Sequence, residues 1–445
     1  MSPLHFLIVV ASLAAGTLPP PGQPAVRILA ASFGLMTGWT LLVAIAAHRC
    51  TVLVDTPERR GGGTGVAAIA GVLDGQLRAF RWIGLAAAAL CLGGFGLGPW
   101  IARHPVLGGS MTVQAVLMLS PATWVLVVGA IGQWWFMWRV DGLFTMPRSK
   151  MLVDAIGYVV AELRCTLAPL AIPTLVMMGV VDVVRWGGTM TGVGQSLVEH
   201  PATIVAGLAV VVVTLPWLMR ATIRRSPMDV TMAHWFDQMT AAAGVGGLRA
   251  VRWDTGGTQF NAMVAGFIGP CRRLYISDRV LDELPRSQIA MIVLHEVAHL
   301  RRRHIPIRIL AVLPAWGAGH LAADFAETWT PTWASAIGLA VGLFITMGLL
   351  GFASRATEHD ADRWACSAAE RIARTGIAGV PADAESAAMA LTTVLRRITG
   401  RDASDRRTWL HPSVQQRAET LNRCFRNPQS RPSRPRWVHR RIWAN

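Results

Sequence analysis

Apolar runs long enough to cross a lipid bilayer recur along the chain, and they constrain its fold more than any other feature. A membrane-spanning helix needs about 20 apolar residues, because each residue advances the helix by about 1.5 Å through about 30 Å of hydrocarbon. Hydrophobic residues make up 52% of the 445-residue sequence and charged residues only 15%. About eight runs meet or approach the required length, at residues 3–18, 26–47, 83–102, 111–137, 166–184, 201–219, 307–323 and 333–352. The sequence therefore predicts a polytopic α-helical membrane protein.

The distribution of charge favours basic loops on one side of a membrane. A formal net charge of +16 would suggest nucleic-acid binding in a soluble protein. The Arg residues, however, gather in alternate loops, at residues 48–81 and 139–164, which is typical of cytoplasmic loops. We therefore expect no nucleic-acid partner and place both termini, with residues 220–306, in the cytoplasm. The six scattered Cys residues include no CxxC pair, which fits a reducing compartment.

The pattern HExxH stands at residues 295–299, inside an apolar run long enough for a buried helix. A spacing of four residues places His295 and His299 on one face of that helix. Two neutral imidazoles so placed can bind one zinc ion, with Glu296 as general base toward the attacking water. The alternative is chance, because a chain with 12 His residues contains this pattern about once in a hundred cases.

The segment that contains HExxH, at residues 220–306, has the pattern of a mixed α/β fold. Asp282 to Pro285 combines acidic residues with Pro, which is typical of the first turn of a helix. One amphipathic helix and three strands are predicted before it, at residues 228–243, 248–253, 261–268 and 273–276.

A third metal ligand is predicted just after the last apolar run, where residues 354–362 read SRATEHDAD. Glu358 and Asp362 are four residues apart, so both carboxylates face the same way on a helix. Glu358 can complete the metal site, and Asp362 can orient an imidazole from outside it. His359 points about 100° around the helix and remains an alternative ligand. Taken alone, the stretch is more typical of a solvated helix face with mixed charges.

The order HExxH, apolar hairpin and SRxxExxAD resembles the membrane zinc endopeptidases that include the CAAX prenyl protease and the bacterial heat-shock protease HtpX. The resemblance implies a gluzincin-type zinc protease domain. It further implies that His295, His299 and Glu358 bind one Zn²⁺ per chain and that Glu296 is the catalytic base. Asp362 matches the aspartate of the family's ExxxD pattern.

Shorter matches extend this resemblance, which covers about residues 255–420. His304 stands where the prenyl protease branch has a His. His411, with Arg417 downstream, resembles a segment near the active site and is expected to aid binding of the oxyanion or substrate carbonyl. An edge strand that binds the substrate backbone is implied at Asn261, Ala262, Met263, Val264, Ala265 and Gly266.

Five segments follow from these patterns. They are an N-terminal membrane region of about six helices, a catalytic segment, a membrane hairpin, a helical part that completes the zinc site and a basic tail, at residues 1–219, 220–306, 307–352, 353–430 and 431–445. The fold class expected is thus a polytopic α-helical membrane protein with a cytoplasmic α+β protease domain.

The function predicted is a membrane-embedded zinc metalloendopeptidase that hydrolyses membrane-associated or misfolded proteins at the cytoplasmic face, in a bacterial inner membrane. Its partners would be a protein or peptide substrate and the lipid bilayer. One alternative is a BlaR-like sensor peptidase that cleaves a regulator, because the Arg run after His299 is similar in that family. Another is a non-enzymatic scaffold or transporter, for which Asp154 and Glu162 would be the acidic pathway residues.

Overall fold

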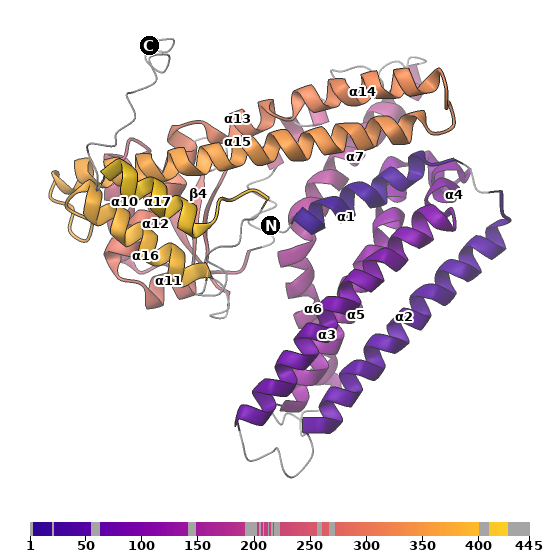
Figure 1. Ribbon diagram of the computed structural model, residues 1–445, viewed down its shortest axis with the longest axis horizontal. Coiled ribbons are helices and arrows are strands. Elements are labelled where there is room, and N and C mark those ends of the chain that lie inside the picture. The colour runs from indigo at the N-terminus through magenta and orange to yellow at the C-terminus, as the bar shows by residue number, and fades with distance from the viewer. Residues whose placement is uncertain are drawn as a thin grey trace. The chain divides into compact units, whose positions relative to one another are not determined.

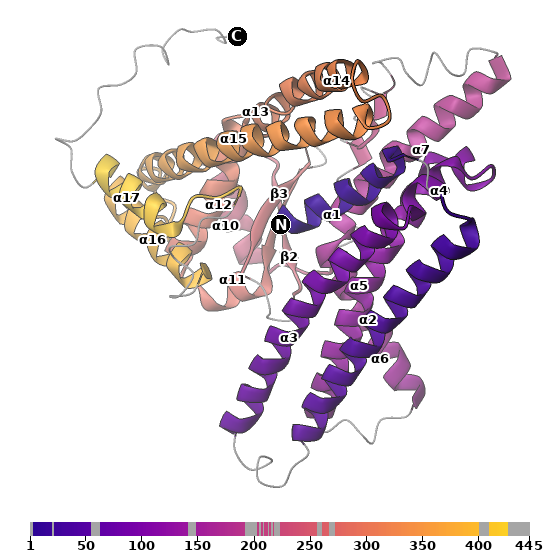
Figure 2. The same ribbon diagram turned by 45° about the vertical axis from the view of Figure 1, so that its right-hand side comes forward.

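The computed structural model describes residues 3–19, 22–54, 63–140, 148–191, parts of 203–217, 223–255, 260–266, 272–399 and 409–425. The chain divides into two compact units. The first comprises Met1–Thr214 with Ala322–Leu339, and the second comprises Leu215–Leu321 with Ala340–Asn445. Figures 1 and 2 show the helices of the first unit and the mixed α/β part of the second. The predicted tail at residues 431–445 lies outside the described residues.

The regular secondary structure described in the first unit is helical (Figure 1). Part of the basic segment at residues 139–164, predicted as a loop, is helical from Arg148 onward. The elements are α1 (Pro3–Ala14), η1 (Ala15–Thr17), α2 (Ala25–Val54), α3 (Gly63–Ala89), η2 (Leu90–Gly94), α4 (Leu97–Arg103), η3 (Leu107–Gly109), α5 (Met111–Val140), α6 (Arg148–Thr166) and α7 (Ala168–Thr191).

Six segments within the described helices are long and apolar enough to cross a membrane: Ala25–Leu53, Ala68–Gly94, Met111–Val140, Ala171–Met190, His304–Glu327 and Ala334–Ala373. The prediction of a polytopic helical membrane protein is therefore confirmed, with six candidate spans among the described residues. The predicted first span is a shorter apolar helix, Ile8–Thr17. The predicted span at residues 201–219 lies largely outside the described residues.

The third span was predicted too far along the chain, at residues 83–102. The helix begins twenty residues earlier, at Gly63, and the apolar stretch ends before Gly96, whose φ of 82° is left-handed. The charges between residues 74 and 81 made that part of the sequence look like a loop. Arg78 and Asp74 instead form an ion pair of 3.0 Å across one helical turn, so the helix continues through them.

Helices α2, α3 and α5 pack together around a shared apolar core. Trp39 of α2 lies against Gly84 of α3, where an added Cβ atom would come within 2.6 Å of the indole ring. The Trp39 Nε1–H donates to the carbonyl of Phe80 at 2.9 Å. In lipid, no hydrophobic effect drives helices together, so their interfaces commonly contain small residues that let the helices approach closely.

A half-buried carboxylate completes the first turn of α5. Both oxygens of Asp182, on α7, accept hydrogen bonds there: the Ser110 hydroxyl at 2.7 Å and the backbone N–H groups of Met111 and Thr112 at 2.7 and 2.9 Å. Helix N-termini carry unpaired N–H groups and partial positive charge, which an acidic side chain satisfies. Asp182 therefore has a structural explanation within the membrane helices.

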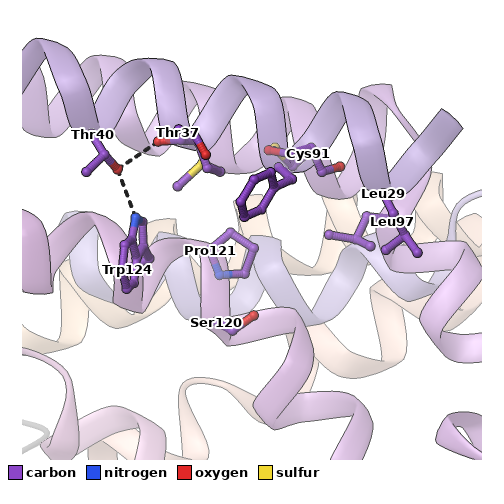
Figure 3. A pocket seen from close by; sticks show the side chains of 11 residues that line it. Leu29, Thr37, Thr40, Cys91, Leu97, Ser120, Pro121 and Trp124 are labelled. Atoms are coloured by element: carbon purple, nitrogen blue, oxygen red, sulfur yellow. Dashed lines mark hydrogen bonds between the residues drawn. The ribbon is translucent and has the colours of Figure 1, made fainter. Parts of the chain in front are cut away.

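An apolar cavity of about 610 Å³ lies beside α2 and α5 in the first unit (Figure 3). Among its lining residues, Trp124 donates from Nε1–H to the hydroxyl of Thr40 at 3.0 Å. The lining residues are Leu29, Ser32, Phe33, Met36, Thr37, Thr40, Cys91, Leu97, Ser120, Pro121 and Trp124.

The second unit contains a four-stranded sheet whose strand order is β1-β2-β4-β3. Strand β2 is parallel to β4, and β1 and β3 run antiparallel to their neighbours. The strand bounds are β1 (Arg225–Ser226), β2 (Arg249–Trp253), β3 (Ala262–Ala265) and β4 (Arg273–Ser277). The three predicted strands are confirmed to within one or two residues where the structure describes them, and β3 lies at an edge of the sheet.

Eight helices complete the described part of this unit, some of which extend into the first. Their bounds are α10 (Val230–Ala242), α11 (Asp278–Glu283), α12 (Arg286–Arg301), α13 (His304–Leu310), α14 (Leu313–Glu327), α15 (Ala334–Ala373), α16 (Ala384–Thr399) and α17 (Val414–Phe425). The core packs α10, α12, α15 and α16 with the sheet. Helices α14 and α15 lie side by side (Figures 1 and 2), and a Cβ atom at Gly342 would come within 3.2 Å of the Ala315 carbonyl.

Candidate metal site

Helix α12 positions the two histidines of the HExxH pattern. Pro285 precedes the helix and fixes its start, and the apolar side chains of Met291, Leu294 and their neighbours are buried in the core. The helix is therefore anchored along one face. On another face, the Nε2 atoms of His295 and His299 lie 3.2 Å apart, so both imidazoles point at one place.

Helix α15 brings a carboxylate to the same place. One oxygen of Glu358 lies 3.5 Å from His295 Nε2, and the other lies 3.4 Å from His299 Nε2. Bonds of about 2.0–2.1 Å with tetrahedral angles would put neighbouring zinc ligands about 3.3–3.5 Å apart. Two imidazoles and one carboxylate are also the donor types that zinc takes in catalytic sites. These three residues therefore fit a metal ion, and their ligand atoms all lie within 4.8 Å of one another.

A buried ion pair stands behind His295. Its Nδ1 lies 2.9 Å from Asp362 Oδ1, and the guanidinium of Arg417 donates to both oxygens of Asp362, at 2.5 and 2.7 Å. Asp362 is 1% exposed and Arg417 is 7% exposed. Burial alone would lower the pKa of Arg417, but the charge of Asp362 outweighs burial and raises it. Asp362 can thus accept the Nδ1–H of His295, which directs its Nε2 toward the metal position.

Glu296 lies next to the edge strand β3. Burial raises the pKa of its carboxyl above the ordinary value, and a hydrogen bond from the backbone N–H of Val264 partly opposes this. Val264 lies in β3, and an N–H group that binds Glu296 points away from the neighbouring strand β4. The open edge of β3 therefore faces Glu296. The structure thus places the predicted base beside the predicted substrate strand, of which residues 261–266 are described.

The segment that carries His411 is fixed to α15 by Trp409. The Trp409 Nε1–H donates to the Met347 carbonyl at 2.7 Å, and the indole covers Gly351, where a Cβ atom would lie 2.8 Å away. His411 then comes within 3.2 Å of Glu358 Oε2, and half of its side chain (52%) is exposed. His411, which was predicted to aid substrate binding, therefore lies next to the candidate ligand Glu358 and is open to solvent.

Two further charged residues at the site were not predicted as site residues. Arg308 of α13 donates to Glu358 Oε1 at 2.9 Å and to the hydroxyl of Thr357. Its position in an apolar run was the signal that could have found it, because a charge there is usually functional or paired. Asp360 is bound by Arg302 and His304. His359, the alternative ligand, is outside the cluster of candidate ligands.

Comparisons with known proteins agree with this geometry. Residues 232–424, which include every candidate ligand, match peptidase family M48. This match confirms the predicted resemblance to the CAAX prenyl protease and HtpX group. No curated protein matches the sequence significantly. Among solved structures, the chain is similar to Ste24p from S. mikatae, with 14% identity over 90% of this chain and 99% of that chain and a TM-score of 0.43.

Proposed function

We propose that this chain, whose residues 232–424 match peptidase family M48, is a membrane-embedded zinc metalloendopeptidase. The observation that carries the proposal is the convergence of His295, His299 and Glu358 at separations of 3.2 to 3.5 Å. Each imidazole lies about one zinc-ligand spacing from the other imidazole and from its nearer Glu358 oxygen, and Glu296 lies on the same helix as both imidazoles. The apolar helices support an integral membrane protein.

The residues have distinct parts in the proposed reaction. Zinc, when bound, would supply Lewis-acid chemistry that polarises a carbonyl and activates water. Glu296 would accept the proton of the attacking water and pass it to the leaving amine. Its raised pKa brings it closer to neutrality, where proton transfer in both directions is efficient. His411 would donate to the substrate carbonyl oxygen, which gains negative charge during attack.

Substrate binding would use the edge of β3. An extended peptide can add to a sheet edge through main-chain hydrogen bonds, which favours loose sequence selectivity. The backbone N–H of Val264 faces Glu296, so a peptide on this edge would pass next to the base. Residues 261–266 would hold its backbone, and the scissile bond would lie between Glu296 and the three ligands.

The substrates we propose are membrane-associated or misfolded proteins that reach the enzyme at the cytoplasmic face of a bacterial inner membrane. The basic loops support that orientation. A sensor peptidase that cleaves a single regulator would use the same site with narrower specificity.

The test is zinc content and proteolysis by the purified full-length chain in detergent, with casein and a membrane protein as substrates. Wild type and Glu296→Gln should each bind one zinc ion per chain, and only wild type should cleave. The loss in kcat should be about 10²- to 10⁴-fold, the usual contribution of a general base. Treatment with a chelator should abolish cleavage, and added zinc should restore it.

Glu370→Gln is the matched control, because Glu370 is a partly exposed residue of α15 whose carboxylate pairs with Arg374 one helical turn away. It should retain full activity. Failure of wild type to bind zinc would refute the proposal. Zinc binding without cleavage of either substrate would favour the sensor peptidase.

A further inference from the structure

A left-handed residue returns the chain to the metal site after α12. Arg303 has φ 55° and ψ 38°, and among the described residues it is the non-glycine residue with positive φ. In a continuous helix, residue 304 would lie about 140° around the axis from His299, because five residues turn by about 500°. The turn at Arg303 instead starts α13 at His304 and brings the two imidazole rings to a centroid distance of 5.0 Å. His304 is 2% exposed.

Both nitrogens of His304 are engaged. Its Nδ1 lies 2.9 Å from Nδ1 of His299, and its Nε2 lies 3.0 Å from Oδ2 of Asp360. Arg302 also donates to Asp360, at 2.8 and 3.3 Å. A carboxylate paired with Arg in this way is ionised, so it accepts hydrogen bonds and donates none.

With a neutral imidazole at His304, one set of hydrogen-bond directions satisfies these contacts. Because Asp360 only accepts, Nε2 of His304 carries the hydrogen, and the neutral ring then accepts at Nδ1. His299 must therefore donate from its own Nδ1. That leaves Nε2 of His299 as a lone pair, which is the atom facing His295 and Glu358. A metal ligand needs this tautomer.

We propose that His304 and Asp360 are positioning residues that hold His299 in its metal-binding tautomer and orientation; this inference rests on the proposed zinc site. The arrangement parallels the one behind His295, whose Nδ1 meets a carboxylate directly. Each ligand imidazole is thus backed by an Asp–Arg pair, and His299 reaches its pair through one intervening imidazole. Outer partners of this kind typically change metal affinity by about 10- to 100-fold when they are removed.

The experiment measures zinc affinity rather than activity, by competition with a chromogenic chelator on the purified full-length chain in detergent. His304→Leu and Asp360→Ala should each lower zinc affinity by about 10- to 100-fold. The double variant should bind zinc no more weakly than His304→Leu, because both substitutions break the same series of hydrogen bonds. His304→Asn should recover part of the affinity, since its amide oxygen can still accept from His299 Nδ1.

The control is Asp282→Ala, because Asp282 forms a two-bond pair with Arg252 on the same unit without touching the site. Its zinc affinity should equal that of wild type. Thermal melts of the metal-free variants check folding, and if His304→Leu does not fold, Asp360→Ala decides, because Asp360 is 29% exposed.

Two outcomes would overturn the inference while the proposed function stands. One is wild-type zinc affinity in Asp360→Ala and His304→Leu. The other is a double variant whose fold-loss in zinc affinity equals the product of the two single fold-losses. Such independent effects would exclude a shared series of hydrogen bonds from Asp360 through His304 to His299. If wild type itself binds no zinc, the proposed function fails and the inference fails with it.

Discussion

Removing Arg417 should destabilise the second unit far more than the loss of one surface ion pair would. Arg417 is the cation that faces Asp362 through two charge-assisted bonds of 2.5 and 2.7 Å. Both side chains are more than nine-tenths buried. Arg417→Met keeps an unbranched apolar side chain but leaves the Asp362 carboxylate facing His295 without its guanidinium partner. Breaking one side of a buried pair typically costs about 3–5 kcal/mol.

The assay is reversible denaturant unfolding of the metal-free full-length chain in mixed micelles, followed by tryptophan fluorescence. Because no metal is present, the free energy of unfolding reports the ion pair without a contribution from zinc binding. Arg417→Met and Asp362→Asn should each lower the free energy of unfolding by about 3–5 kcal/mol. The double variant should lose less than the sum of the two, because it leaves no unpaired charge in the interior.

Arg252→Met provides the matched control. Arg252 binds Asp282 with the same two-bond geometry, at 3.0 and 2.7 Å, but the two side chains are 31% and 56% exposed. Its loss should cost at most about 1 kcal/mol, as is usual for pairs in water. If Arg417→Met costs no more than this control, or if the two buried substitutions are additive, the explanation by an unpaired buried charge is refuted.

Three shorter predictions concern the strand, the turn and the base. Val264→Pro removes the N–H that binds Glu296 and should lower kcat/KM by about 10- to 100-fold, since a hydrogen bond to a charge contributes about 1.5–3 kcal/mol; Val264→Ala, which keeps the N–H, should retain activity. Arg303→Val should lower the thermal midpoint through about 1–3 kcal/mol of backbone strain, whereas Arg303→Gly should not; equal midpoints would contradict the left-handed turn. Because burial raises the pKa of Glu296, kcat/KM should rise with pH through a value above the ordinary 4.5; an acid limb at or below 4.5 would contradict this assignment.

The elements around the candidate site could be predicted from local sequence because each has its own signal. Alternating apolar residues and Gly-rich turns delimit β2 and β4, and Pro285 marks the start of α12. Residues four apart on a helix share a face, whatever the tertiary structure. That rule is enough to pair His295 with His299, and the structure brings both to Glu358.

The parts that were missed depend on contacts between distant segments. Asp360 lies between two acids that were singled out, and its sequence context is that of a solvated helix face. Its contact with His304 depends on the turn at Arg303, and Arg is not a residue that favours a left-handed conformation. Arg308 was included in an apolar run, where its pairing with Glu358 is invisible to a hydropathy average. The contacts of Asp360 and Arg308 thus depend on tertiary structure, which the hydrophobic periodicity of the sequence does not show.

Helix α15 links the membrane-spanning character of the chain to its chemistry. Residues 334–353 carry no charged side chain, and about 20 helical residues extend about 30 Å, the thickness of the hydrocarbon layer. The helix continues without a break to Ala373, so Glu358 lies about 7 Å beyond the end of that uncharged stretch. Arg308 approaches Glu358 from α13, which precedes the other half of the hairpin. If the uncharged stretch spans the bilayer, the metal site lies at the membrane surface, where it would meet segments of membrane proteins as they leave the lipid. This geometry supports membrane-associated substrates independently of any relative.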